Sequence, residues 1–166
     1  PVLSENLAHY LDLYNKWSSY TPEKDGVMIA YASIYGNTKK AAELLYDKLK
    51  AKGVDVIITD LARCDMSKAI SDAFAYSKLV LATPTYNADV FPFMRTFIEG
   101  LTERNYQKRT VAFIENGAWA PMAAKVMTGM FEKSKEINIL DKTVKITCAL
   151  NDASAAQVDE LADELA

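Results

Sequence analysis

Several side chains that can form hydrogen bonds lie in one turn, which follows an apolar run and precedes a helical pattern. The turn reads Ser33, Ile34, Tyr35, Gly36, Asn37 and Thr38. A turn that leads into a helix presents free backbone N–H groups and the positive end of the helix dipole. The hydroxyl groups of Ser33, Tyr35 and Thr38 add further donors, and Gly36 permits a backbone twist that a Cβ opposes. A phosphate group requires several such donors. The same residue types also serve as ordinary helix caps, so the turn alone leaves both interpretations open.

Two common nucleotide-binding motifs are absent from the sequence. There is no G-x-x-x-x-G-K-[ST] motif, which argues against a cradle for a magnesium nucleoside triphosphate. There is also no G-x-G-x-x-G motif, so the dinucleotide fingerprint is missing. A mononucleotide phosphate remains the candidate ligand for the turn.

Two further loops carry aromatic and amide side chains. One contains Pro84, Thr85, Tyr86 and Asn87, and the other contains Glu115, Asn116, Gly117, Ala118 and Trp119. Taken alone, Tyr86 and Trp119 are each typical of an aromatic side chain that packs in the protein or at an interface. Together they could hold a planar ring between two aromatic faces. The amides of Asn87 and Asn116 and the open backbone beside Gly117 offer partners for the polar edge of a heterocycle. Together with the polar turn, these loops predict a slot for a phosphate, a sugar chain and a ring.

The elements that must position these loops are short apolar runs that alternate with amphipathic stretches. Strands are expected at 27–32, 54–59, 79–82, 111–114 and 144–149, and helices at 37–52, 66–74, 91–104, 122–136 and 152–165. Five strands that are each followed by a helix predict right-handed crossovers and a parallel sheet with both faces covered. This is a three-layer, doubly wound α/β fold. Ligands of such sheets bind beyond the carboxyl ends of the strands, where the three loops are expected to meet.

The length and composition predict one domain with a short extension. Half of the 166 residues are hydrophobic, which is sufficient for one substantial core. Residues 3–20 repeat apolar side chains at helical spacing, and a proline, a glycine and charges follow them. We therefore expect a linker helix within residues 1–25 and the α/β domain at 26–166.

Charge and residue usage exclude several classes of function. A net charge of −3 disfavours broad binding of nucleic acid or of anionic membranes, which attract basic surfaces. The sequence has neither an apolar run long enough to cross a bilayer nor a signal for export, so we expect a cytoplasmic protein. The single histidine, His9, is expected on a helix surface, and it excludes imidazole-based metal sites and His-based triads. Cys64 and Cys148 are expected to be buried thiols in a reducing compartment, neither paired in a disulfide nor binding a metal.

The three loops resemble those of a known family. The S-x-Y-G-N-T turn, the T-P-T-Y-N loop and the N-G-x-W loop are similar to the flavodoxin-like FMN domain of the A-type flavoproteins, the flavodiiron proteins. The similarity extends over about residues 27–166, and the leading helix with Lys16 and Trp17 resembles the linker to a preceding domain. The sequence departs from the family at Ala120-Pro121, where many members have glycines and where the proline removes an N–H group.

The resemblance implies a noncovalent FMN and a flavodoxin-like fold with strand order 2-1-3-4-5, the order that flavodoxin itself exemplifies. The FMN phosphate would lie in the turn from Ser33 to Thr38. The isoalloxazine would lie between residues 84–87 and residues 115–119. The chain would relay electrons and would need no catalytic acid, base or metal ligand of its own, because the cofactor carries the chemistry.

The resemblance also implies partners outside this chain. In the family, rubredoxin or a similar carrier supplies electrons, and a diiron centre in a lactamase-like domain reduces dioxygen or nitric oxide. A head-to-tail homodimer brings the flavin of one subunit near the irons of the other. We therefore expect the chain to be a piece of a longer oxidoreductase, and whether it is an enzyme by itself stays open.

Two alternative functions share the predicted fold. An NAD(P)H-dependent quinone or metal reductase would also bind a flavin, and it would require an open site for nicotinamide above the ring. A signalling receiver would require clustered carboxylates after the first strand and an aspartate after the third strand. The sequence has Ser33 and Thr83-Pro84 at these positions, which disfavours the receiver.

Overall fold

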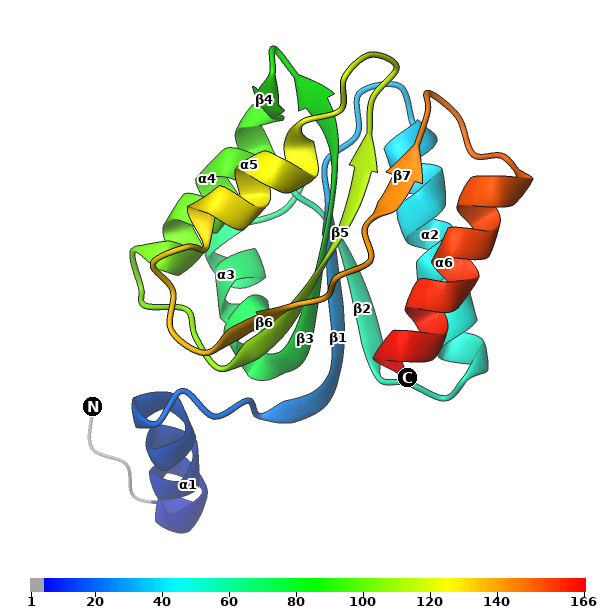
Figure 1. Ribbon diagram of the computed structural model, residues 1–166. Helices are drawn as coiled ribbons and strands as arrows, with labels where there is room; N and C mark the ends of the chain where they lie inside the picture. Colours follow the sequence, from blue (N-terminus) through cyan, green and yellow to red (C-terminus); the bar gives the residue numbers. More distant parts are fainter. Residues whose placement is uncertain (1–4) are drawn as a thin grey trace.

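A mostly parallel sheet forms the centre of the molecule (Figure 1). The computed structural model describes residues 5–166. The long strands are β1 (Lys24–Tyr31), β2 (Val56–Asp60), β3 (Tyr76–Tyr86) and β5 (Arg109–Asn116). Two short strands, β6 (Ile137–Ile139) and β7 (Val144–Ile146), both pair in parallel with β5. The order β2-β1-β3-β5-β6 confirms the predicted order, with the fifth strand divided into β6 and β7 along one edge of β5.

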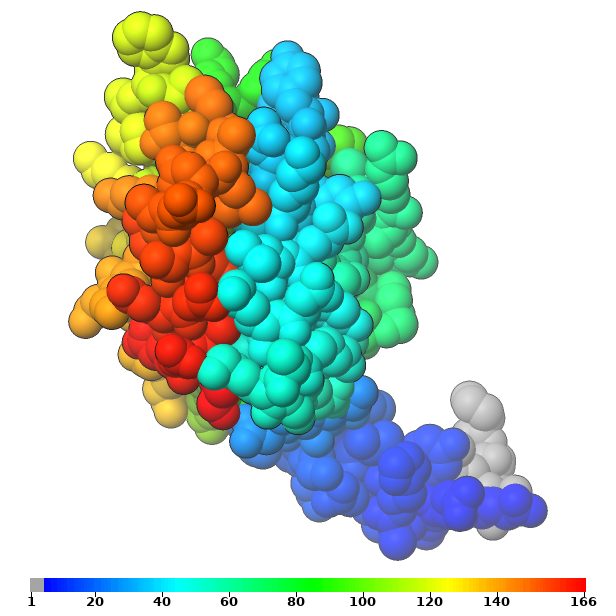
Figure 2. All heavy atoms as spheres, turned by 90° about the vertical axis from the view of Figure 1, so that its right-hand side faces the viewer, coloured from blue at the N-terminus to red at the C-terminus, as the bar shows by residue number. Residues whose placement is uncertain are grey.

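Helices cover both faces of the sheet and complete the three predicted layers. On one face lie α3 (Met66–Ala75), α4 (Pro92–Thr102) and α5 (Ala123–Met130), and on the other lie α2 (Asn37–Ala51) and α6 (Asp152–Leu165). Figure 2 shows α2 and α6 side by side on the second face. Because side chains alternate along a strand, Met28 of β1 packs toward the first face and Ile29 toward the second. Burying each such side chain contributes about 1.5–3 kcal/mol to folding.

One predicted helix and one predicted strand end three or more residues earlier in the structure than in the prediction. The helix expected at 122–136 ends at Met130, and β6 follows it. The strand expected at 144–149 ends at Ile146, because Cys148 has a left-handed φ of 65°. The expectation of two buried cysteines is wrong for Cys148, which is exposed in the turn after β7, whereas Cys64 is partly buried.

Helix α1 (Leu7–Ser18) lies at the amino ends of the strands, far from the loops at their carboxyl ends (Figure 1). None of its residues is buried, and His9 is exposed as expected. The expected helix begins at Leu3, which lies outside the described residues. Backbone carbonyls just after α1 accept hydrogen bonds from the sheet domain. Arg109 Nη1 lies 2.6 Å from Tyr20 O, and Lys108 Nζ lies 3.0 Å from Ser19 O. Within residues 5–166, no helix has the length and apolarity needed to cross a bilayer.

Candidate functional site

The three predicted loops meet at the carboxyl edge of the sheet and enclose one hollow of about 250 Å³. Its lining includes ten of the predicted residues: Ser33, Ile34, Tyr35, Asn37, Thr38, Pro84, Thr85, Asn116, Gly117 and Ala118. Cys148 also lines the hollow, although no feature of the sequence indicated it. Gly36, Tyr86, Asn87, Glu115 and Trp119 belong to the same loops without lining the hollow. A larger hollow of about 760 Å³ lies beside Tyr20 and Tyr106, away from these loops.

The turn before α2 holds several unused hydrogen-bond donors. Gly36 precedes the helix with a φ of 87°, and its N–H donates to Ser33 Oγ at 3.1 Å. Glycine adopts this left-handed conformation without steric cost. The first N–H of the helix with a backbone acceptor is that of Lys40, which donates to Gly36 O. Within residues 5–166, the N–H groups of Asn37, Thr38 and Lys39 have no acceptor, as is general for the first turn of an uncapped helix.

The Thr38 hydroxyl is a further donor beside these N–H groups. Thr38 is buried, with 2% of its surface exposed, and its Oγ1 accepts a hydrogen bond from Asn116 Nδ2 at 3.3 Å. Within residues 5–166 its own proton has no acceptor. The nearby lysines do not add a fixed positive charge, because Lys39 lies 3.6 Å from the Glu43 carboxylate and Lys40 is exposed. The turn therefore offers a cradle of neutral donors, and two of the residues that carry them, Asn37 and Thr38, line the hollow.

Asn116 joins the parts of the site at the end of β5. Its Cα lies in register with Pro84 of β3 and with Ile146 of β7. Besides contacting Thr38, its Nδ2 donates to the Cys148 carbonyl at 3.2 Å. One buried amide thus connects the start of α2 with the turn after β7.

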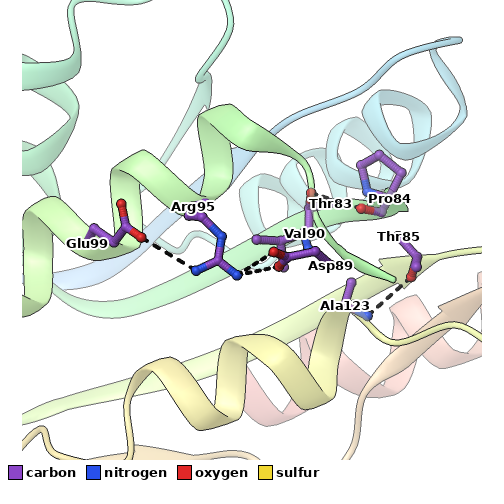
Figure 3. Close-up of polar contacts among 8 residues, drawn as sticks. All are labelled: Thr83, Pro84, Thr85, Asp89, Val90, Arg95, Glu99 and Ala123. Atoms are coloured by element: carbon purple, nitrogen blue, oxygen red, sulfur yellow. Dashed lines mark hydrogen bonds and ion pairs between the residues drawn. The ribbon is translucent and has the colours of Figure 1, made fainter. Parts of the chain in front are cut away.

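Two side chains of the predicted set hold the start of α5. Thr85 Oγ1 accepts hydrogen bonds from the backbone N–H groups of Met122 at 3.0 Å and Ala123 at 3.2 Å, the second of which is drawn in Figure 3. The buried Glu115 carboxylate accepts from the Ala124 N–H at 3.0 Å. A negative charge at the N-terminus of a helix is stabilising. The Glu115 side chain is therefore engaged by α5 and does not line the hollow.

Gly117 allows the loop after β5 to fold closely upon itself. A Cβ at this position would lie 3.1 Å from Pro121 Cβ and 3.4 Å from Thr85 Oγ1. The Gly117 N–H donates to Ile146 O at 3.0 Å. Ala120 has a φ of 34°, which turns the chain back so that Pro121 covers Gly117. The Ala120-Pro121 departure from the family pattern thus forms a tight turn.

A hairpin formed by β3 and β4 (Asp89–Val90) carries Tyr86 at the rim of the hollow. Its two turn residues, Asn87 and Ala88, have φ values of 52° and 57°, as a tight two-residue hairpin turn requires. Arg95 of α4 holds the hairpin, because its Nη2 lies 2.6 Å from Asp89 Oδ2 (Figure 3). This hydrogen bond lowers the pKa of Asp89 below its ordinary value.

The aromatic side chains at the rim are exposed. Tyr35 and Trp119 have 91% and 89% of their surface exposed, and Tyr86 has 49%. The Tyr86 ring packs edge-on against Phe91, with ring centroids 5.4 Å apart. The site therefore consists of a recessed cradle of donors and an open aromatic rim.

A donor cradle at a helix start, placed at the carboxyl edge of a doubly wound sheet, defines a class of α/β proteins that bind a phosphate-bearing ligand. The sequence of residues 29–152 matches the flavodoxin family. The chain belongs to this family, and the part of the flavodiiron proteins that it resembles is their flavodoxin-like part.

Comparison with individual proteins gives the same result. The chain is 30% identical over 159 residues to an uncharacterised protein of Methanocaldococcus jannaschii, a match that covers 94% of this chain and 40% of the relative. The structure is similar to the rubredoxin oxygen:oxidoreductase of Desulfovibrio gigas, with a TM-score of 0.87 at 18% identity over 95% of this chain and 39% of that one. It is also similar to the flavodiiron protein of Giardia intestinalis, with a TM-score of 0.89 at 15% identity over 98% of this chain and 40% of that one. The chain spans about two fifths of the length of each.

The cofactor of this family is FMN, and the cradle fits its phosphate. A phosphate monoester offers three acceptor oxygens, and the turn offers three free N–H groups and the buried Thr38 proton. The carboxylate nearest in sequence to the hollow, that of Glu115, is directed to α5 instead. The donor set is therefore suited to an anion.

Proposed function

We propose that this chain is an FMN-binding electron-transfer domain that relays electrons between a carrier and a metal centre outside the chain. The observation that carries this proposal is the set of free donors at the start of α2, which has no use in the fold itself. Bound FMN supplies a ring that takes up and releases electrons, and the protein sets its position and environment.

In this proposal the residues divide into a phosphate group and a ring group. The N–H groups of Asn37, Thr38 and Lys39 and the Thr38 hydroxyl donate to the phosphate. The chain segments from Ile34 to Gly36 close the turn around it. The ring lies against the hairpin and the loop after β5. Tyr86 and Trp119 cover it, and Asn87, Gly117 and Ala118 offer hydrogen-bond partners to its polar edge.

The exposed rim supports transfer to another protein. Ile34, Tyr35, Tyr86, Phe93 and Trp119 are large hydrophobic side chains that remain exposed around the site or beside it. Exposed apolar patches with polar surroundings mark interaction surfaces. We infer that rubredoxin or a similar carrier delivers electrons here. The acceptor is a diiron centre in a lactamase-like domain, as the names and lengths of the flavodiiron relatives support.

The position of α1 supports a head-to-tail homodimer of the parent protein. If the lactamase-like domain is joined through α1, it begins at the amino edge of the sheet, opposite the candidate site (Figure 1). The diiron centre of a second subunit can then face this flavin more readily than the diiron centre of the same chain. Two chains arranged head to tail satisfy this geometry twice.

The proposal is tested by the visible spectrum of the purified chain after incubation with FMN and removal of the excess. We expect a yellow protein whose released flavin is FMN. A protein that stays colourless would overturn the proposal. Rapid bleaching of the bound flavin by NADH would instead support an NAD(P)H-dependent reductase, and its absence supports the relay.

A further inference from the structure

We propose that Asn116 is a positioning residue for phosphate recognition, which fixes the Thr38 hydroxyl as a donor and thereby makes the site select FMN over riboflavin. This inference rests on the proposed function. It assigns the Asn116 side chain to the phosphate end of the ligand, whereas the sequence pattern indicated the polar edge of the ring.

The orientation of the Asn116 amide follows from its partners. The Cys148 carbonyl can only accept a hydrogen bond, and it lies 3.2 Å from Asn116 Nδ2. If the amide were flipped, two carbonyl oxygens would face each other, which is repulsive. The Nδ2 group must therefore face Cys148, and the same nitrogen lies 3.3 Å from Thr38 Oγ1.

The direction of the Thr38 proton follows from this amide. An amide NH₂ group donates and does not accept, so Thr38 Oγ1 is the acceptor in its bond with Asn116. The single hydroxyl proton is then free to donate elsewhere, and no residue within 5–166 accepts it. Thr38 and Asn116 both line the hollow. An oxyanion in the hollow is the kind of acceptor that this proton requires.

The burial of Thr38 and Asn116 strengthens the hydrogen bond between them. Thr38 and Asn116 expose only 2% and 9% of their surface, so water competes weakly for either side chain. The backbone of Asn116 is fixed by pairing with β3 on one side and β7 on the other. The Thr38 oxygen is thus held in place, with its proton turned away from Asn116, before the ligand arrives, and preorganised donors bind an anion more strongly than mobile ones.

Two substitutions of Asn116 test the inference. For each variant, the dissociation constants of FMN and riboflavin are measured by the quenching of flavin fluorescence when the flavin is titrated with the apoprotein. Asn116→Ala should raise the FMN constant about 10-fold, the size expected for losing one hydrogen bond to a charged group. Asn116→Asp should raise it about 100-fold, because the carboxylate accepts the Thr38 proton and also repels the phosphate. The riboflavin constant should change less than about 3-fold in both variants, since riboflavin has no phosphate.

Thr38→Val supplies a double-mutant cycle. Because Asn116 acts through the Thr38 hydroxyl, adding Asn116→Ala to Thr38→Val should cause little further loss of FMN affinity. Asn138→Ala is a matched control, because Asn138 is exposed on β6, far from the hollow, and this change should leave both constants unaltered. Circular dichroism establishes that each variant is folded.

Parallel losses of FMN and riboflavin affinity in Asn116→Ala would overturn the inference, since they place the side chain at the ring. Additive effects of Asn116→Ala and Thr38→Val would also overturn it. If Asn116→Asp does not fold, Asn116→Ala and the cycle still decide the question. A wild-type chain that binds neither flavin would overturn the proposed function itself, and the inference with it.

Discussion

At the scale of single residues, the site is marked by hydrogen-bonding groups that the fold leaves unused. The buried guanidinium of Arg109 shows the usual case: it has no carboxylate partner within residues 5–166, and it donates instead to backbone carbonyls that include those of Tyr76 and Tyr20. At the start of α2 the donors instead remain free. Because these donors lie beside a hollow and include the buried Thr38 hydroxyl, they indicate a ligand site more specifically than the presence of serine, threonine and asparagine in the sequence.

Gly36→Ala separates the role of the turn in binding from its role in folding. Gly36 and Gly53 both have left-handed φ values, 87° and 78°, and a Cβ would meet no atom within 4 Å at either position. Each alanine substitution should therefore lower the free energy of unfolding by about 1–2 kcal/mol through backbone strain alone. Urea denaturation of the apoprotein measures this loss. Only Gly36→Ala should also weaken FMN binding, and equal FMN affinities in the two variants would contradict the assignment of the turn.

Tyr106→Phe tests a polar group that is buried without a ligand or a partner. The Tyr106 hydroxyl is fully buried and has no hydrogen-bond partner within residues 5–166, and burial raises its pKa. The ring packs edge-on against Phe74 at 5.1 Å, a contact that phenylalanine keeps. Thermal denaturation should show the variant to be as stable as wild type or more stable, by up to about 1–3 kcal/mol. Thr85→Val, which removes an acceptor of two N–H groups, should be destabilising in the same assay.

At the scale of elements, the hairpin of β3 and β4 depends on a connection to α4 that the sequence alone does not reveal. Asp89 and Arg95 are six residues apart and belong to a strand and a helix, so no helical spacing predicts their contact. Arg95 also lies 3.5 Å from Glu99, so its guanidinium lies between Asp89 of β4 and Glu99 of α4 (Figure 3). The connection holds Tyr86 at the rim of the site.

Asp89→Asn should loosen this connection and weaken binding of FMN and riboflavin to the same degree, because in the proposed site the hairpin faces the ring. This pattern is the opposite of that expected for Asn116. The Arg95 hydrogen bond lowers the Asp89 pKa in the folded state, so its stabilisation is present above the ordinary pKa of 3.8 and is lost as the pH falls through the lowered value. Both side chains are more than a third exposed, so the effect on stability should be small and weakened by salt.

Unfolding of wild type and Asp89→Asn, followed by circular dichroism between about pH 7 and pH 2, measures this dependence; the two proteins should converge in stability at the acid end. Asp72→Asn, which removes a surface ion pair with Lys68 on α3, is the control and should leave flavin binding unchanged. A loss of FMN affinity in Asp89→Asn without a loss of riboflavin affinity would contradict the role of the hairpin.

Removal of residues 1–18 should leave the sheet domain folded and able to bind FMN. No residue of α1 is buried, whereas the carbonyls that Lys108 and Arg109 contact belong to Ser19 and Tyr20, which the truncated chain keeps. The thermal midpoint and the FMN dissociation constant should stay close to those of the full chain. A truncated chain that is unfolded at 25 °C would contradict the predicted division into residues 1–25 and 26–166.

Much of the element pattern is predictable from the sequence, and the exceptions have physical causes. The helix expected at 152–165 has its predicted ends, because Val158, Leu161 and Leu165 recur at helical spacing and the helix stands between clear boundaries. The helix expected at 122–136 is too long, because the charged residues after Met130 are good helix formers. Their preference is overridden by the pairing of Ile137 and Ile139 with β5, a contact between distant segments.

For the candidate site, the sequence indicates the three loops that the structure brings together, but it does not indicate the tertiary contacts between them. The turn before α2 and the loops after β3 and β5 contain polar and aromatic residues and directly follow apolar runs. These two features indicate them as candidate ligand-binding loops. The sequence does not predict that Cys148 lines the hollow. Its left-handed φ of 65° forms a turn, and cysteine is not a residue type that indicates one. The hydrogen bonds of Asn116 and Thr85 join segments that are far apart in sequence, and no spacing rule indicates them.

At the scale of the whole molecule, the exposed large hydrophobic side chains within residues 5–166 fall into two groups at opposite ends of the sheet. The group on α1 consists of Leu7, Tyr10, Leu11, Tyr14 and Trp17. The group on the loops around the candidate site and on α4 beside them consists of Ile34, Tyr35, Tyr86, Phe93 and Trp119. Figure 2 shows α1 projecting from the lower end of the domain. Two separated apolar surfaces are consistent with the proposed head-to-tail assembly, in which each end of the chain meets a different partner surface.

The central claim, that three loops at the carboxyl edge of the sheet hold FMN by its phosphate, is tested most directly by calorimetric titration of the apoprotein with FMN and, separately, with riboflavin. We predict saturation at one FMN per chain and a riboflavin affinity lower by about 10-fold or more, as expected for the loss of several hydrogen bonds to a charged group. Equal affinities for the two flavins, or no heat of binding with either, would contradict the claim.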